Sequence, residues 1–382
     1  MRVMISCGEP SGDLYAAGLI DALRARVPSV EVFGFGGRRF ERAGGRLIGD
    51  FAGISVTGLT EAIRVIPRSY RMLRRLVESA RTDRPDVFVA LDFPDFNFRL
   101  MAAIHALGIP VVYYISPQLW AWRAGRIAAM QKYVDRVLVI FPFEVELYRA
   151  AGVPVEFVGH PLIEMSSPGE SRDAFLIRLG LQPDRPTVAL LPGSRHNEVA
   201  RTIPTLAAAL PLIRDAVSGV QFVVACAPEL PAAVFTPLSA AAAPLALVPG
   251  QTDNVLASTD VAITASGTAT VQCALHERPA VVVYRLSGLT YRLAKRFVRV
   301  DHIAMPNLVA GRRILPELIQ DQFTPARVAA ETVRLLQDRE QHAAVRAALR
   351  DVRARLGGPG ASGRAADAVL AVAHRPVGSS QS

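Results

Sequence analysis

Residues 187–198 read TVALLPGSRHNE, and this short stretch contains a complete strand, loop and helix start. A run of β-forming and apolar residues comes first, and Pro192 and Gly193 then interrupt it. Polar residues follow, and a helix is expected to begin near Glu198. An apolar run without polar alternation indicates a strand that is buried on both faces, as in a parallel sheet.

The same unit recurs along the chain. Strands are expected at 2–7, 30–36, 86–92, 111–116, 136–141 and 155–160, and a second series at 187–193, 220–227, 261–267 and 280–285. Helix-length amphipathic segments separate most of these strands. Such alternation predicts an α/β protein with two doubly wound parallel sheets.

A polar stretch, SSPGESRD at 166–173, predicts the linker between the two series. We therefore expect an N-terminal domain at 1–165 and a C-terminal domain at 166–350. Residues 351–382 are expected to form C-terminal helices that pack back on the N-terminal domain, followed by a disordered tail after His374.

Composition narrows the class of protein. The 382 residues include 43 Lys and Arg against 34 Asp and Glu, and the net charge of +9 either favours anionic partners or reflects an Arg-rich proteome. Three distant cysteines argue against disulfides and zinc, and fit a reducing cytoplasm. The uncharged stretch 230–252 contains four prolines, so we expect turns and a short strand there and no membrane-spanning helix.

Polar loops follow several of the expected strands, at the edge where parallel sheets bind ligands. In PGSR, Gly193 permits a tight turn and Ser194 and Arg195 offer donors suited to a diphosphate. SGTAT repeats this arrangement with Ser266, Gly267 and Thr268. The alternative for both loops is an ordinary capped helix start.

The loop DFPDFN, at 92–97, carries two carboxylates. Asp92 ends a strand, where a catalytic base would be held rigidly, and the alternative is an acceptor that ties the loop. Asp95 and Asn97 are expected to cap the following helix. We expect no metal, because D-x-D is absent. His160 either donates to a phosphate or acyl carbonyl or has a structural role.

Residues 58–81 predict one or two short basic amphipathic helices. The segment could lie on an anionic membrane, or pack on the core with a solvated basic face.

These motifs together resemble the lipid-A-disaccharide synthase family. The resemblance rests on GEPSGD (8–13), DFPDFN (92–97), SPQLWAWR (116–123), VGHP (158–161), LLPGSR (190–195), SGTAT (266–270) and MPNLVAGR (305–312). Their order covers nearly the whole chain, and SP-x-x-WAWR is the most specific element.

The resemblance implies a GT-B inverting glycosyltransferase whose two Rossmann-like domains face each other across a cleft. The N-terminal domain would serve the acceptor and lipid side, and the C-terminal domain would bind the UDP-sugar. The enzyme would transfer 2,3-diacylglucosamine from its UDP donor to the 6-hydroxyl of 2,3-diacylglucosamine 1-phosphate. It would need no metal or other cofactor and bind no nucleic acid. It would sit peripherally on the inner face of the cytoplasmic membrane, and a homodimer is allowed.

The resemblance also implies roles for individual residues. Asp92, Arg195 and Asn307 would be catalytic. Substrate and nucleotide contacts would come from Ser11, Gly12, Ser116, Trp120, Arg123, His160, Gly193, Ser194, Glu198, Ser266, Gly267, Thr268 and Gln272. Apart from the resemblance, if the basic segment 58–81 faces the lipid and not the core, membrane contacts would come from Ile63, Ile66, Arg68 and Leu73.

Two positions depart from the family pattern: Gln272 stands where a Glu is usual, and Glu164 where an Asp is usual. The chain's two tryptophans, Trp120 and Trp122, either pack the acceptor side or only stiffen their loop. Two other functions stay open. One is a different UDP-sugar GT-B enzyme, such as a peptidoglycan glucosaminyltransferase or a UDP-sugar 2-epimerase. The other is a catalytically silent lipid-binding paralogue.

Overall fold

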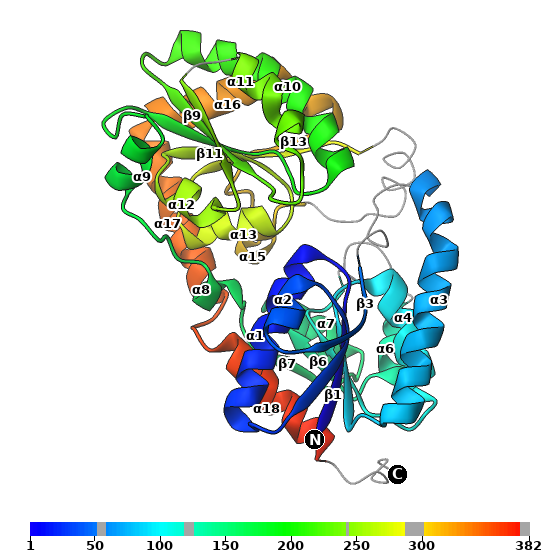
Figure 1. The fold of residues 1–382 in the computed structure, drawn as a ribbon. Coiled ribbons are helices and arrows are strands. Elements are labelled where there is room, and N and C mark those ends of the chain that lie inside the picture. The colour runs from blue at the N-terminus through cyan, green and yellow to red at the C-terminus, as the bar shows by residue number, and fades with distance from the viewer. Residues whose placement is uncertain (52–58, 118–125, 242–243, 287–301, 375–382) are drawn as a thin grey trace. The chain divides into compact units, whose positions relative to one another are not determined.

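The computed structural model describes residues 1–51, 59–117, 126–241, 244–286 and 302–374, with the backbone alone for 59–65 (Figure 1). Trp120, Trp122, Arg123 and the tail after His374 lie outside this description. The chain divides into two compact units. One comprises Met1–Glu164 together with the chain from Leu356, and the other comprises the described residues between Met165 and Arg355.

The first unit is a parallel sheet of seven described strands in the order β3-β2-β1-β4-β5-β6-β7. The strands are β1 Arg2–Cys7, β2 Glu31–Gly36, β3 Arg46–Asp50, β4 Val87–Leu91, β5 Val111–Tyr114, β6 Arg136–Val139 and β7 Val155–Phe157. The helices are α1 Pro10–Arg26, α2 Arg38–Arg42, α3 Leu59–Asp83, α4 Pro94–His105, α6 Ile127–Tyr133, α7 Glu144–Ala150, α8 Leu162–Met165 and α18 Ala361–Ala373.

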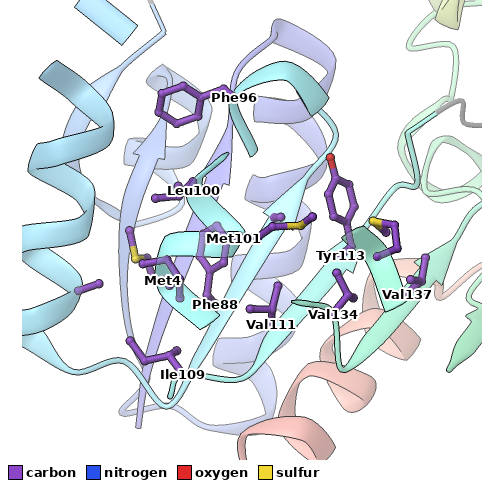
Figure 2. Close-up of a cluster of buried hydrophobic side chains, with 14 of the residues drawn as sticks. Met4, Phe88, Phe96, Leu100, Met101, Ile109, Val111, Tyr113, Val134 and Val137 are labelled. Carbon is purple, nitrogen blue, oxygen red and sulfur yellow. The ribbon is translucent and has the colours of Figure 1, made fainter. Parts of the chain in front are cut away.

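The central strands of this sheet are buried on both faces, as their uninterrupted apolar sequences predict. On one face, Met4, Phe88 and Tyr113 pack with Leu100 and Met101 of α4 (Figure 2). On the other, the C-terminal helix α18 lies alongside α1 and contacts β4, β5 and β6. The last helix of the chain is therefore part of the core of the first unit.

The second unit is a parallel sheet of six described strands in the order β10-β9-β8-β11-β12-β13. The strands are β8 Thr187–Leu191, β9 Gln221–Cys226, β10 Leu245–Pro249, β11 Val261–Ala265, β12 Ala280–Tyr284 and β13 Glu317–Ile319. The α-helices are α9 Arg172–Arg178, α10 His196–Ala216, α11 Thr236–Ala241, α12 Thr252–Ala257, α13 Thr268–Leu275, α15 Met305–Ala310, α16 Pro325–Gln337 and α17 Arg339–Arg355. Two 3₁₀ turns, Ala232–Phe235 and Gln320–Gln322, complete it.

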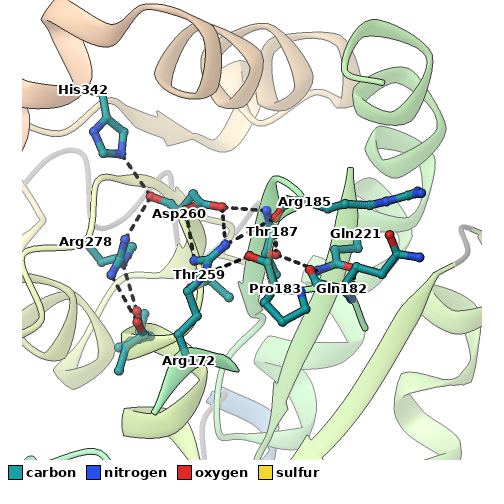
Figure 3. Close-up of polar contacts among 12 residues, drawn as sticks. Arg172, Gln182, Pro183, Arg185, Thr187, Gln221, Thr259, Asp260, Arg278 and His342 are labelled. Atoms are coloured by element: carbon teal, nitrogen blue, oxygen red, sulfur yellow. Dashed lines mark hydrogen bonds and ion pairs between the residues drawn. The ribbon is translucent and has the colours of Figure 1, made fainter. Parts of the chain in front are cut away.

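A polar network joins the amino ends of the strands in the second unit (Figure 3). Asp260 precedes β11, and its carboxylate accepts from Arg172 at 3.0 and 3.1 Å and from the backbone N–H of Thr187 at 2.8 Å. The Thr187 hydroxyl accepts from Gln221 at 2.9 Å, which ties β8 to β9. These contacts fix how the three neighbouring strands β8, β9 and β11 are aligned along the strand direction.

The two parallel sheets confirm the predicted fold class. Residues 59–83 form one helix although Pro67 lies inside it, where the sequence allowed two. The segment 230–252 contains α11 as well as the expected turns and strand. Strands β3 and β13 were not predicted, because three to five residues without a long apolar run give no clear strand signal.

Candidate active site

Each sheet has one place where the strand order reverses direction. In the first sheet it lies between β1 and β4, where Cys7 pairs with Leu91. In the second sheet it lies between β8 and β11, where Leu191 pairs with Thr264. Crevices at such switch points, beyond the carboxyl ends of the strands, are where open α/β sheets bind ligands. The loops that follow these four strands are GEPSGD, DFPDFN, PGSR and SGTAT.

Asp92 leaves β4 in a strained conformation. It and Phe93 both have left-handed backbones, with φ of 45° and 49°. The Asp92 carbonyl accepts hydrogen bonds from the Asn97 amide and the Tyr113 hydroxyl, each at 2.8 Å. Two consecutive left-handed residues that are not glycine cost free energy, and such strain is concentrated at functional sites. The half-buried Asp92 is thus held in one place.

Asn97, one of the two expected caps of α4, has a different role. Asn97 is fully buried and accepts from the Ser6 hydroxyl at 2.7 Å while it donates to carbonyls that include Asp92. Asp95 lies in the first turn of the helix with an exposed side chain that pairs with Arg126 at 2.6 Å. Asn97 therefore stabilises the loop through buried hydrogen bonds, and Asp95 forms a surface ion pair.

The GEPSGD loop crosses the sheet edge beside Asp92. Gly8 has no room for a side chain, because a Cβ there would lie 2.2 Å from the Phe93 ring. Ser11 is half-buried in the first turn of α1, and Gly12 is buried. A Cβ on Gly12 would lie only 3.3 Å from Cys7 Cβ and 3.4 Å from Leu91 Cδ2, which explains this glycine by packing.

Asp13 has a role that the sequence did not suggest. Its buried carboxylate accepts from the backbone N–H groups of Gly37, Arg39 and Phe40 at 2.8–3.0 Å. These are the otherwise unpaired donors at the start of α2, so Asp13 caps that helix from another element. The sequence signal for this capping role was a carboxylate in an otherwise apolar stretch of α1.

Ser116 and His160 are both buried. The Ser116 hydroxyl donates to the Pro117 carbonyl at 3.0 Å and accepts from the Tyr148 hydroxyl at 2.6 Å. Burial lowers the pKa of His160 to about 3, and its Nδ1 accepts from the N–H of Leu162 at 3.2 Å. His160 is therefore a neutral imidazole whose proton is on Nε2, and Ser116 is engaged within the protein.

The PGSR loop follows β8 and leads into α10. Gly193 has φ of 124°, and a Cβ there would lie 2.5 Å from the Glu198 carboxylate. That carboxylate accepts from the backbone N–H of Ser194 at 3.2 Å. Arg195 is the N-cap residue with an exposed side chain. A long helix thus begins at the switch point, with its positive end and a guanidinium beside the loop.

The SGTAT loop follows β11 on the neighbouring strand. The Ser266 hydroxyl donates to the Ile303 carbonyl at 3.1 Å. Gly267 is the N-cap of α13 with φ of 147°, and no described residue lies within 4 Å of where its Cβ would be. Gly267 and Thr268 are exposed. The loop therefore leaves open space beside the start of α13, while Ser266 is used within the protein.

Asn307 follows the start of α15 and is held within the protein. It is fully buried, and its amide donates to the Leu315 carbonyl at 2.9 Å and to Glu317 at 2.7 Å. Its oxygen accepts from the N–H groups of Ile314 and Leu315 at 2.9 and 2.8 Å. All four hydrogen-bonding positions of the amide are used, so Asn307 holds the loop that follows α15, and its catalytic role stays a prediction.

Helix α3 presents a basic and partly apolar surface. Ile66 is 55% exposed and Tyr70 is 60% exposed, and Arg68, Arg71, Arg74 and Arg75 are exposed around them. Leu73, by contrast, is partly buried and packs against the core cluster. The side chain of Ile63 lies outside the described residues. Tyr70 was not predicted as a membrane contact. Its position one turn after Ile66 was the signal in the sequence, because residues at that spacing share a helix face.

The described ranges contain neither a membrane-spanning helix nor a cluster of metal-binding side chains. No helix there combines the length and hydrophobicity needed to cross a bilayer. No three His, Cys, Asp or Glu side chains in the same ranges are grouped as a metal site would require.

Known proteins resemble this chain in sequence and in fold. Residues 3–372 match the model of the lipid-A-disaccharide synthetase family. A lipid-A-disaccharide synthase of Anaeromyxobacter dehalogenans is 45% identical over 373 residues, which cover 97% of both chains. Two solved structures are similar in fold. They are a calicheamicin glycosyltransferase (TM-score 0.61, 17% identity, 97% of each chain) and the UDP-GlcNAc 2-epimerase of Neisseria meningitidis (TM-score 0.67, 12% identity, 97% of this chain and 100% of that one).

Proposed function

The chain belongs to the lipid-A-disaccharide synthetase family, and from that membership we propose the reaction that it catalyses. It is a GT-B hexosyltransferase of lipid A synthesis that uses a UDP-sugar. Its donor is UDP-2,3-diacylglucosamine, and its acceptor is 2,3-diacylglucosamine 1-phosphate. The products are the β-1,6-linked disaccharide 1-phosphate and UDP.

One observation carries this proposal beyond the family match. Motif loops border the switch point of both sheets, so each unit has a ligand-binding edge of its own. The loops of the second unit combine two helix N-termini with Arg195, which suits a nucleoside diphosphate. The loops of the first unit place a carboxylate, Asp92, on a rigid strand end, which suits the acceptor hydroxyl.

Asp92 is the general base of the proposed reaction. Inversion at the anomeric carbon requires a proton to leave the acceptor 6-hydroxyl as that oxygen attacks the sugar. The carboxylate takes this proton. The hydrogen bonds from Asn97 and Tyr113 to the Asp92 carbonyl support the role, because they hold the backbone from which the carboxylate projects.

The leaving group is UDP, whose diphosphate gains negative charge as the glycosidic bond breaks. Arg195 and the amino ends of α10 and α13 stabilise this charge. Gly193 and Gly267 contribute by allowing the backbone N–H groups to approach the phosphates closely.

Both substrates carry acyl chains, and the enzyme therefore works at the membrane surface, on the inner face of the cytoplasmic membrane. Helix α3 is the contact surface in this proposal. Ile66 and Tyr70 enter the interfacial region, and the surrounding arginines attract anionic lipid headgroups. Leu73 packs on the core, whereas Ile66 and Tyr70, nearer the amino end of the helix, are exposed and available for the lipid contact.

A transferase assay tests the function directly. Purified protein is mixed with radiolabelled UDP-2,3-diacylglucosamine and 2,3-diacylglucosamine 1-phosphate in detergent, and the disaccharide is separated by thin-layer chromatography. We expect disaccharide and UDP in equal amounts. Formation of free UDP without acceptor, or epimerisation of UDP-N-acetylglucosamine in its place, would indicate another UDP-sugar enzyme. UDP binding without turnover of any donor would indicate a silent paralogue.

A further inference from the structure

Glu317 is a buried carboxylate on the short strand β13, and only 2% of its surface is exposed. Its Oε1 accepts from the backbone N–H of Ala304 at 2.9 Å and from the Asn307 amide at 2.7 Å. The backbone nitrogen of Ile303 lies 3.2 Å from both carboxylate oxygens and donates to them. All of these contacts come from N–H donors, which suits an ionised carboxylate, because that group can only accept.

The segment that Glu317 holds is also bonded to the SGTAT loop. The Ser266 hydroxyl donates to the Ile303 carbonyl at 3.1 Å. That carbonyl and the N–H of Ala304 belong to the same peptide group, and in the usual trans form they point in opposite directions. Glu317 and Ser266 therefore bind opposite sides of one planar peptide, so a single rigid group links the buried carboxylate to the loop.

The charge of Glu317 strengthens this link. A carboxylate on the N–H side of a peptide polarises it, and the Ile303 carbonyl becomes a better acceptor for the Ser266 proton. Ser266 comes directly before Gly267, the N-cap of α13. A bond that fixes Ser266 therefore also fixes the start of that helix.

We propose that Glu317 is a positioning residue that orders the SGTAT loop through the Ile303–Ala304 peptide and the Ser266 hydroxyl. The inference rests on the proposed function, in which the amino end of α13 stabilises the diphosphate of the departing UDP. Glu317 itself touches no substrate. In this role it keeps the exposed residues Gly267 and Thr268 ordered before the nucleotide arrives, which lowers the free-energy cost of binding it.

The competing explanation is that Glu317 only stabilises the turn into α15. Gln221 provides a matched control, because its buried side chain also forms three hydrogen bonds, two with the backbone of Gln182 and one with Thr187. It lies at the amino ends of the strands, opposite the SGTAT loop. Gln221→Ala should therefore destabilise the second unit without weakening UDP binding.

Isothermal titration of the full chain with UDP, applied to a double-mutant cycle, tests the proposal. We expect Glu317→Gln to weaken UDP binding about tenfold, because the amide loses the charge and turns a donor toward an N–H group. Ser266→Ala should have an effect of similar size. Since Glu317 acts through Ser266, the double variant should bind UDP within about twofold of the weaker single variant.

Steady-state kinetics in the transferase assay give a second measurement. Glu317→Gln should raise the KM for the UDP-sugar about tenfold and leave the KM for the acceptor within about twofold, because the SGTAT loop belongs to the donor side. A carboxylate that only stabilised α15 would not separate the two substrates in this way.

Circular dichroism and thermal unfolding verify that each variant folds. If Glu317→Gln does not fold, Glu317→Asp takes its place in the cycle, because it keeps the charge and withdraws the carboxylate from the peptide. The proposal is overturned if the Glu317 variant binds UDP as the wild type does, or if its effect and that of Ser266→Ala are additive.

The proposal is also overturned if Gln221→Ala weakens UDP binding as much as the Glu317 variant, or if the KM values of both substrates rise equally. A wild-type chain that binds no UDP contradicts the proposed function itself. A chain that binds UDP but fails these comparisons contradicts only the role of Glu317.

Discussion

At the scale of single residues, the polar side chains of the motifs divide into those that face the ligand edge and those that hold the loops. Asn97, Asn307 and Asp13 are buried and bonded to backbone groups of other segments. The sequence predicted their loops and could not predict their roles, because a buried amide or carboxylate finds partners that are distant in the chain. Asp92 was predicted as a strand-end carboxylate, and its left-handed backbone was not.

Asp92→Asn should reduce turnover about 100-fold or more and leave UDP affinity near that of the wild type. The amide keeps the shape of the carboxylate and cannot accept the proton. Steady-state kinetics and titration with UDP measure the two effects. Asp95→Asn is the control, since that carboxylate forms an exposed ion pair with Arg126, and it should retain turnover. Equal losses in the two variants would contradict the assignment of Asp92.

Arg195→Ala should weaken donor binding and slow transfer together. Its charge acts on the diphosphate before and during departure of the leaving group, so a loss of about 2–4 kcal/mol in kcat/KM is expected. Arg201→Ala, on the same helix, serves as the comparison. Unchanged UDP affinity and kinetics in the Arg195 variant would leave that residue as a helix cap only.

The buried His160 should make the protein less stable in acid. Burial lowers its folded pKa to about 3, whereas the unfolded chain binds the proton below about 6.5. The unfolded state thus holds more protons between these values. The contribution of His160 is complete above pH 6.5 and declines by about 1.4 kcal/mol per pH unit below it.

Urea unfolding between pH 7 and 4.5 measures this slope. His160→Gln should flatten it, whatever its effect at neutral pH, and His105→Gln, at an exposed position, should not. An unchanged slope in the His160 variant would contradict the prediction.

At the scale of elements, long apolar runs and amphipathic helices were predictable, and the shortest strands were not. Helix α3 was predicted with two possible roles, core and membrane. The structure assigns Leu73 and Leu76 to the protein side and leaves Ile66 and Tyr70 exposed. Spacing along the sequence could not separate these two sets, because they belong to adjacent parts of the same helix surface.

Ile66→Ser with Tyr70→Ser should reduce binding to vesicles that contain anionic lipid, without loss of helix content. Each exposed arginine near such a surface contributes about 1 kcal/mol, so binding should also fall as salt increases. Vesicle flotation measures it. Ile177→Ser on α9, which removes an exposed apolar side chain elsewhere, is the control. Undiminished flotation of the double variant would exclude this part of α3 as the lipid contact.

At the scale of the whole molecule, chain order and structural units do not coincide. The chain leaves the first unit after Glu164 and returns to it at Leu356. The Glu164 carboxylate accepts hydrogen bonds from the backbone N–H groups of Gly360 and Ser362. It therefore connects the end of the segment Met1–Glu164 to the start of α18. Alternating strands and helices predicted two sheets, and the packing of α18 depends on apolar faces whose partners are more than 200 residues away.

Deletion of the chain from Ala361 onward should destabilise the first unit selectively. The deletion exposes α1, β4 and β5, which α18 covers. Hydrogen exchange should accelerate in β1, β4 and β5 and stay slow in β8 and β11. Arg26→Ala removes only the exposed pair with Asp367 and should cost at most about 1 kcal/mol. Equal acceleration in both units would contradict the assignment of α18.

The network around Asp260 lies at the amino ends of β8, β9 and β11, opposite the edge that carries the PGSR and SGTAT loops. Scaffold rigidity and ligand recognition therefore depend on separate sets of side chains. Libraries randomised at the carboxyl edge could change nucleotide preference while Arg172, Thr187 and Gln221 keep the strands aligned. The second unit is thus a suitable starting point for directed evolution toward other sugar nucleotides.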